Sequence, residues 1–281
     1  IEQFHLLFLA QLARRVKPGL YVLKGGCNLR FFHRSVRYSE DMDLDLGEIG
    51  RETFRDEVRK LLASRPFAEI LEARALAIDR VSEPKQTETT QRWKIGLRVQ
   101  GAGAPLPTKI ECSRGGLEDG VALGSVDPNV ARGYQLPPFL VSHYDAAAAL
   151  RQKIGELAGR RETQARDVFD LQLLLAGGAP LPVRDDEIAA RACANALSVD
   201  FGTFRSQVLS YLEPDARSQY DSPSAWDAIV LEVVDALRRE NVDVPAGAAD
   251  RGATEALVRV GARGRTARDI TTIPIKRPDG T

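Results

Sequence analysis

The chain has 281 residues, enough for one large or two small domains, and 43% of them are hydrophobic and 28% charged, as in an ordinary globular protein. Its 39 basic side chains equal its 39 acidic ones, which excludes a histone-like or polybasic binder but not a local basic surface. No apolar run approaches the roughly 18 residues of a membrane helix, and the first residues lack a signal-peptide cleavage pattern, so we expect a cytoplasmic protein without a membrane partner.

The cysteines Cys27, Cys112 and Cys193 are odd in number and far apart, with no CxxC pair, and only three histidines accompany them. We therefore expect neither disulfides nor a zinc site. The cysteines are interpreted as small buried residues.

Helices and strands alternate in the first part of the chain. In order, the patterns predict a helix over 2–15, a short strand over 20–23, a helix over 27–34, a strand over 40–46, a helix over 51–63, and strands over 92–99 and 108–113. This order predicts an α+β fold whose first lobe, residues 1–135, carries a mixed sheet. The turn-rich sequence GYQLPPF marks its end.

Helices dominate the rest of the chain. Ser142 and Asp145 have the spacing of a capping box that would start a helix running to about Leu157, and a second helix runs from Thr163 to a glycine pair. Further helices are expected near 185–197, 201–212 and 224–240. We therefore predict a mainly helical lobe over 136–244 and a mobile, weakly basic tail rich in glycine, alanine and arginine over 245–281.

An acidic strand is the first candidate for chemistry. Asp41, Asp43 and Asp45 alternate with apolar residues, so they share one face of the strand, about 6.6 Å apart along the backbone. Neighbouring carboxylates at this spacing can converge on paired Mg²⁺ ions, which would activate a hydroxyl and hold a triphosphate. A solvated acidic edge strand would have the same pattern.

A glycine turn before this strand is a candidate phosphate-binding element. Lys24, Gly25 and Gly26 lie between a strand and a helix, where glycine permits close approach and the helix N-terminus offers free N–H groups. A tight turn with a surface lysine is the simpler interpretation.

Three more charged residues are candidates in the middle of the chain. Glu111 is expected to point to the same side of its strand as Lys109, where it could complete a metal cluster or lie in solvent. Lys153 suits a triphosphate, Asp167 could orient it through an ion pair, and Arg160, Arg161 and Arg166 could face an RNA backbone. Ordinary surface ion pairs on a helical hairpin would explain the same residues.

Two motifs in a fixed order give the chain a family resemblance. The segment LKGGCNLRFFHRSVRYSEDMDLDL, followed by a lysine and then RDVFDL, resembles the AbiEii family of nucleotidyltransferase toxins from bacterial abortive-infection and toxin–antitoxin systems, including their mycobacterial relatives. In that family a KGG turn precedes an R-x-S-x-D-x-D strand, matched here by Arg37, Ser39, Asp41 and Asp43. The match is tight over 20–46 and 142–175.

The resemblance implies a polymerase-β-like catalytic lobe, a helical second lobe, Mg²⁺ (or Mn²⁺) and an NTP as substrate. It implies that NMP passes to an acceptor, which for some members is the 3′ end of tRNA, so that translation and growth stop. It further implies a cognate antitoxin encoded nearby. On this basis the catalytic residues are Asp41, Asp43, Lys153 and Asp167, the nucleotide-binding residues are Lys24, Gly25, Gly26 and Ser39, and the metal ligands are Asp41, Asp43 and, by strand phase, Glu111.

The sequence departs from the family pattern at two positions. Cys27 stands where a small polar residue such as threonine is expected, and Asp45 adds a carboxylate that could alter the metal geometry. Two rival hypotheses stay open: a transferase of the same fold that acts on a protein or small-molecule hydroxyl, and a nucleotide- or antitoxin-binding module without catalysis. We expect a monomer, because no exposed apolar stripe stands out.

Overall fold

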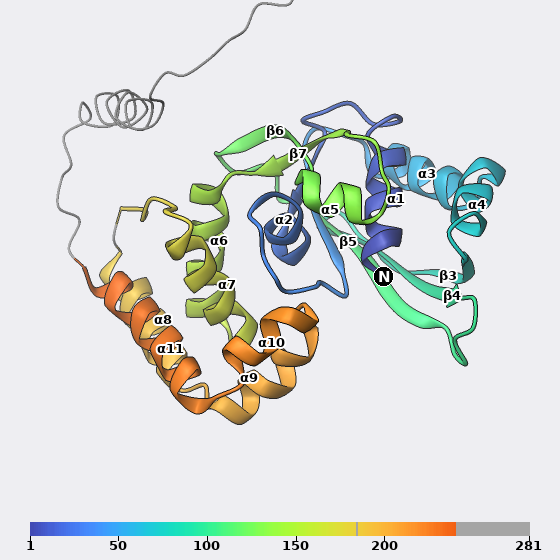
Figure 1. The fold of residues 1–281 in the computed structure, drawn as a ribbon. Coiled ribbons are helices and arrows are strands. Elements are labelled where there is room, and N and C mark those ends of the chain that lie inside the picture. The colour runs from blue at the N-terminus through green and yellow to red at the C-terminus, as the bar shows by residue number, and fades with distance from the viewer. Residues whose placement is uncertain (184, 240–281) are drawn as a thin grey trace, which may run out of the picture. The chain divides into compact units, whose positions relative to one another are not determined.

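A computed structural model of the chain describes residues 1–183 and 185–239. Its centre is a seven-stranded mixed sheet with the strand order β3-β4-β5-β2-β1-β7-β6 (Figure 1). The strands are β1 (Tyr21–Lys24), β2 (Met42–Leu46), β3 (Leu76–Gln86), β4 (Thr90–Val99), β5 (Leu106–Ser113), β6 (Val121–Ser125) and β7 (Leu140–Tyr144). β2 runs antiparallel to β1 and parallel to β5. The predicted α+β fold with a mixed sheet is confirmed.

Five helices accompany the sheet: α1 (Glu2–Leu12), α2 (Gly25–Phe32), α3 (Arg51–Leu62), α4 (Arg65–Glu72) and α5 (Pro128–Gly133). Figure 1 shows α1, α3 and α4 together beside the sheet. Their apolar faces bury Phe8, Phe54 and Phe67 in one core with Leu44 and Trp93 of the strands, where each of these side chains is at most 1% exposed. Burial of such large side chains holds β2 and β5 at fixed positions under the site described below.

Six helices form a second core: α6 (Ala146–Gly159), α7 (Ala165–Ala176), α8 (Asp186–Leu197), α9 (Phe201–Gln207), α10 (Pro214–Tyr220) and α11 (Pro223–Arg238). Phe204 and Trp226 stack with their ring centroids 4.5 Å apart, and Phe169 packs beside them. α7 ends at Gly177, as the glycine pair predicts. No helix among the described residues is long and apolar enough to cross a membrane.

The predicted capping box at Ser142 is wrong. Residues 140–144 form strand β7, which pairs with β1 and β6, and the Ser142 hydroxyl accepts a hydrogen bond from the backbone N–H of Gly19 at 3.0 Å. The N-cap of α6 is Asp145, whose carboxylate accepts from Ala148 N–H. The sheet therefore continues past residue 135, and a single residue separates its strand from the first helix of the second core.

Five elements have no counterpart among the predicted ones: the short elements α4, α5, β6 and α10, and the long strand β3. The helix expected over 201–212 divides into α9 and a 3₁₀ turn at Leu209–Tyr211. The described residues form one compact unit that contains both cores. The tail predicted over 245–281 lies outside the described residues.

Candidate active site

The β1–α2 turn approaches the acidic strand so closely that only glycine fits. Gly25 has a φ of +64°, and a Cβ atom on it would lie 2.9 Å from Asp43 Oδ2. A Cβ atom on Gly26 would lie 2.7 Å from Ser39 Oγ. The glycine pair therefore brings the start of α2, with its unpaired N–H groups, against the carboxylates that follow.

The three aspartates of the acidic segment have two different environments. Asp41, just before β2, and Asp43, on it, face the same cavity. Asp45 is buried, accepts a hydrogen bond from the Tyr144 hydroxyl at 2.9 Å, and pairs with Lys24 Nζ at 2.5 Å. The additional carboxylate of the sequence is thus neutralised inside the fold and does not line the cavity.

Burial shapes the electrostatics of Asp43. It raises the pKa of this carboxyl to about 6, because the charged form loses water; the Lys109 ammonium counteracts the shift and the Asp41 carboxylate adds to it. The negative charge of Asp43 is therefore only partly compensated by its surroundings. A cation placed between Asp41 and Asp43 would stabilise both.

Glu111 lies opposite Asp43 in the parallel pairing of β2 with β5. Its carboxylate is held by Arg92 of β4 through two hydrogen bonds of 2.8 and 2.9 Å. Burial would raise the pKa of Glu111, but Arg92 and then Lys109 lower it below its ordinary value. Glu111 therefore stays ionised with its oxygens already engaged, and it does not line the cavity.

A second group of charges joins the acidic segment to the helices. This six-charge cluster consists of three cations and three carboxylates: Arg37, Lys153, Arg160, Glu156, Asp167 and Asp170. Arg37 donates two hydrogen bonds, of 3.0 and 2.8 Å, to the carboxylate of Asp170. Lys153 Nζ lies 3.3 Å from Asp167 and 3.2 Å from Asp170. The predicted ion pair between Lys153 and Asp167 is confirmed.

Lys153 is charged despite being 6% exposed. Burial alone would lower its pKa, but Asp170, then Glu156 and Asp167, raise the pKa above its ordinary value. Asp170 and Asp167 are fully buried. The helical core thus holds the ammonium group of Lys153 in a fixed position at the edge of the cavity.

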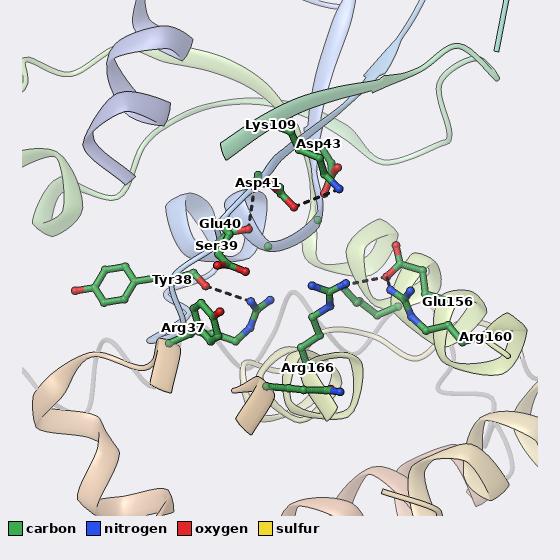
Figure 2. A pocket seen from close by; sticks show the side chains of 15 residues that line it. Arg37, Tyr38, Ser39, Glu40, Asp41, Asp43, Lys109, Glu156, Arg160 and Arg166 are labelled. Atoms are coloured by element: carbon green, nitrogen blue, oxygen red, sulfur yellow. Dashed lines mark hydrogen bonds and ion pairs between the residues drawn. The ribbon is translucent and has the colours of Figure 1, made fainter. Parts of the chain in front are cut away.

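The cavity has an empty volume of about 670 Å³, including its open mouth (Figure 2). Its lining comes from both parts of the fold: Gly25, Gly26, Arg37, Tyr38, Ser39, Glu40, Asp41, Asp43, Lys109, Lys153, Glu156, Arg160, Arg166, Gln207 and Tyr211. Figure 2 shows Asp41, Asp43 and Lys109 on one side, and Glu156, Arg160 and Arg166 on the other. Arg166 has no carboxylate within ion-pair distance among the described residues, so it is available to an anionic ligand.

Of the nine residues expected to be catalytic, nucleotide-binding or metal-binding, six line the cavity: Gly25, Gly26, Ser39, Asp41, Asp43 and Lys153. The arginines Arg37, Arg160 and Arg166, also noted in the sequence, line it too. Lys24, Glu111 and Asp167 do not line the cavity. Lys24 pairs with Asp45, Glu111 with Arg92, and Asp167 with Lys153 and Arg160. Lys109, Tyr38 and Tyr211 line the cavity without having been selected. The shared strand phase with Glu111 was a signal for Lys109, whereas nothing in the sequence pattern distinguishes the two tyrosines.

A buried polar chain supports the acidic segment from below. The Cys27 thiol donates to the backbone carbonyl of Asp41 at 3.2 Å, and the Thr108 hydroxyl donates to the carbonyl of Glu40 at 2.6 Å. His5 lies 2.8 Å from Thr108 Oγ1 and 3.5 Å from Cys27 Sγ. Burial lowers the pKa of His5 to about 3 and raises that of Cys27, so both side chains are neutral. All three cysteines are buried, as predicted.

The donor set decides which metal ion the cavity suits. Among the described residues no three His, Cys, Asp or Glu side chains are grouped as a complete metal site. The carboxylates of Asp41 and Asp43 are hard oxygen ligands that face the open cavity, which fits an ion such as Mg²⁺ that keeps waters and takes substrate phosphates as further ligands.

A family model described as "Nucleotidyl transferase AbiEii toxin, Type IV TA system" matches residues 7–244. Two solved structures are similar in fold. MenT4, a nucleotidyltransferase toxin of Mycobacterium tuberculosis H37Rv, has a TM-score of 0.55 at 14% identity, over 86% of this chain and 84% of that one. A candidate nucleotidyltransferase from H. pylori has a TM-score of 0.51 at 17% identity, over 84% and 94%. No curated protein matches the chain.

Proposed function

Because the chain belongs to the AbiEii family of nucleotidyl transferase toxins, we propose that it transfers NMP from an NTP to the 3′ end of tRNA and thereby stops translation and growth. Nucleotidyl transfer follows from the family, and the tRNA acceptor follows from the resemblance to members that modify tRNA. The protein would act as a monomer in the cytoplasm, where tRNA and NTPs are present, and a cognate antitoxin would restrain it.

One observation carries the proposal. The cavity combines two carboxylates, a glycine turn at a helix N-terminus and the buried ammonium of Lys153, which are the groups that hold and activate a triphosphate. They come from segments more than 100 residues apart. A module that only bound a partner protein would have no chemical need for this combination.

In the proposed reaction the acceptor hydroxyl oxygen attacks the α-phosphorus of the NTP. A P–O bond to the acceptor forms, the bond between the α-phosphorus and its bridging oxygen breaks, pyrophosphate leaves with the electron pair, and the hydroxyl proton passes to solvent. Mg²⁺, held by Asp41 and Asp43, would supply charge neutralisation at the phosphates and favour the attacking alkoxide.

The chain's own groups position the substrate. Gly26 lets the phosphates approach the backbone N–H groups of α2, beside the Ser39 hydroxyl. Lys153, held in place by Asp167, neutralises charge on the leaving pyrophosphate. Arg160 and Arg166 line the side of the cavity through which the sugar–phosphate backbone of the acceptor would enter.

The test is incubation of the purified protein with total tRNA, Mg²⁺ and each α-labelled NTP in turn, beside the Asp41→Ala variant. We expect label on tRNA with the wild type and none with the variant, which loses a metal ligand. The labelled reaction also identifies the nucleotide.

Other outcomes separate the rivals. Label on a protein or a small molecule instead of tRNA would overturn the acceptor and keep the transferase. NTP binding without transfer to any acceptor would favour a module that has lost catalysis. Transfer by Asp41→Ala at the wild-type rate would refute the assignment of the metal ligands.

A further inference from the structure

Lys109 places an ammonium group inside the carboxylate cluster. The pairing of β2 with β5 aligns Met42 with Ile110, so the preceding residues, Asp41 and Lys109, lie next to each other. Lys109 Nζ lies 3.2 Å from Asp41 Oδ2 and 3.6 Å from Glu111 Oε2. Figure 2 shows Lys109 beside both Asp41 and Asp43 at the cavity wall.

The charges around Lys109 are nearly balanced. Asp41, Asp43 and Glu111 contribute three negative charges, and Lys109 and Arg92 supply two positive ones. Arg92 occupies both oxygens of Glu111. Among the described residues, Lys109 is therefore the only cation within ion-pair distance of the Asp41 carboxylate, which it contacts at Oδ2.

We infer that Lys109 competes with the divalent metal ion for Asp41, so that the free protein binds the metal weakly. This rests on the proposed function, since the metal is the one that the transferase would use. An ammonium group and a divalent cation repel each other at such distances and cannot share one carboxylate oxygen without loss. Asp41 and Lys109 are 35% and 34% exposed, so their ion pair is weak and exchanges easily.

When the metal binds together with the NTP, the Lys109 ammonium group has an alternative anionic partner. Its flexible four-carbon stem lets the ammonium group move from Asp41 to a phosphate oxygen. The negative charge of the triphosphate then balances the positive charges of both the metal and Lys109. The carboxylates alone do not balance both. Lys109 thus lowers the metal affinity of the free protein and does so less once the NTP is bound.

The experiment measures binding of Mn²⁺ alone to the full chain, from the EPR signal of the free ion. We expect Lys109→Met to bind Mn²⁺ roughly tenfold more tightly than the wild type, because a positive charge next to the ion is removed. Lys109→Arg keeps the charge and should stay near the wild type. Lys94→Met is the matched control: Lys94 is the register partner of Lys109 on β4, is exposed, and has no carboxylate within ion-pair distance among the described residues.

Each outcome of this experiment supports or overturns the inference. Equal Mn²⁺ affinity of Lys109→Met and the wild type would overturn the inference. An equal gain of Mn²⁺ affinity in Lys94→Met would also overturn it, because it would indicate only a general change of the electrostatic potential. Asp41→Asn separates this inference from the proposed function. If Asp41→Asn leaves Mn²⁺ binding intact, the metal assignment itself fails; if it abolishes binding while Lys109→Met gains nothing, only the role of Lys109 fails. Thermal unfolding of each variant verifies that it is folded.

Discussion

The raised pKa of Asp43 makes this carboxylate a destabilising group at neutral pH. Its pKa rises from 3.8 to about 6 on folding. Between these two pH values the native state therefore binds a proton that the unfolded chain has released. By linkage, the protein without metal loses stability as the pH rises from about 4 to about 6. A functional site that costs stability is expected where charges are assembled for a ligand.

Asp43→Asn removes this cost. At pH 7.5, without divalent ions, we expect the free energy of unfolding of the variant to exceed that of the wild type by about 1 to 2 kcal/mol, a value discounted for the partial exposure of the site. The difference should disappear below about pH 3, where the wild-type carboxyl is protonated in both the folded and the unfolded state. Urea unfolding across this pH range measures it, and a constant difference at all pH values would contradict the titration of Asp43.

Two glycines in different surroundings give a matched pair. Gly26→Ala would place a methyl group 2.7 Å from Ser39 Oγ, whereas Gly155, in the exposed middle of α6, has nothing within 4 Å of the corresponding position. We expect Gly26→Ala to lower stability by about 1 to 3 kcal/mol and to reduce nucleotidyl transfer. Gly155→Ala should raise stability by about 0.5 to 1 kcal/mol, as alanine does in a helix interior. Denaturant midpoints test both, and equal effects would refute the close approach at Gly26.

The link between the loop before β2 and α7 depends on the carboxylate of Asp170, which binds Arg37 and Lys153 together. Burial would raise the pKa of Asp170, but Arg37 and then Lys153 lower it, so Asp170 is charged. Asp170→Asn leaves two buried cations without full compensation, and we expect a loss of about 3 to 5 kcal/mol of stability. Asp79→Asn, which breaks the exposed pair with Arg98, should change little. A loss no larger than that of Asp79→Asn would show that the six-charge cluster does not hold α7 in place.

The elements that the sequence predicts best have a strong apolar period. β4 alternates buried residues with less buried ones along its length, and α7 buries Val168, Leu171 and Leu174 at helical spacing. β3 is mostly exposed, so its residues carry no alternation. β7 buries Ser142 and His143, whose polar side chains suggest a loop or a helix cap, and only the neighbouring strands make it a strand. Such elements depend on partners that a local pattern does not contain.

In the candidate site, too, some features follow from the local sequence and others depend on neighbouring strands. The alternation around Asp41 and Asp43 and the close glycine turn follow from local rules. The engagement of Glu111 by Arg92, and the approach of Lys109 to Asp41, depend on the registers of β4, β5 and β2. Register is fixed by packing across the whole sheet, so the sequence predicts the carboxylates but not that Arg92 and Lys109 contact them.

Ligand binding should stabilise the protein as one cooperative unit, because the cavity is lined by both cores. An NTP with Mg²⁺ at about a hundred times its Kd adds about 2.7 kcal/mol to the free energy of unfolding. We expect the preferred NTP to raise the Tm by several degrees in Mg²⁺, with no shift in EDTA or in Asp41→Asn. A full shift in EDTA would show that nucleotide binding does not require the metal.

The position of β7 determines where the protein can be divided into two separately expressed fragments. β7 lies between β1 and β6, yet it follows both in the chain and runs almost directly into α6. A recombinant fragment of residues 1–135 would carry β6 without β7, the one strand that pairs with it among the described residues, and would leave one edge of β1 unpaired, which invites aggregation. A split-protein reporter or a bacterial two-fragment complementation assay would therefore be cut after α6, at residues 160–164, where the sheet stays whole.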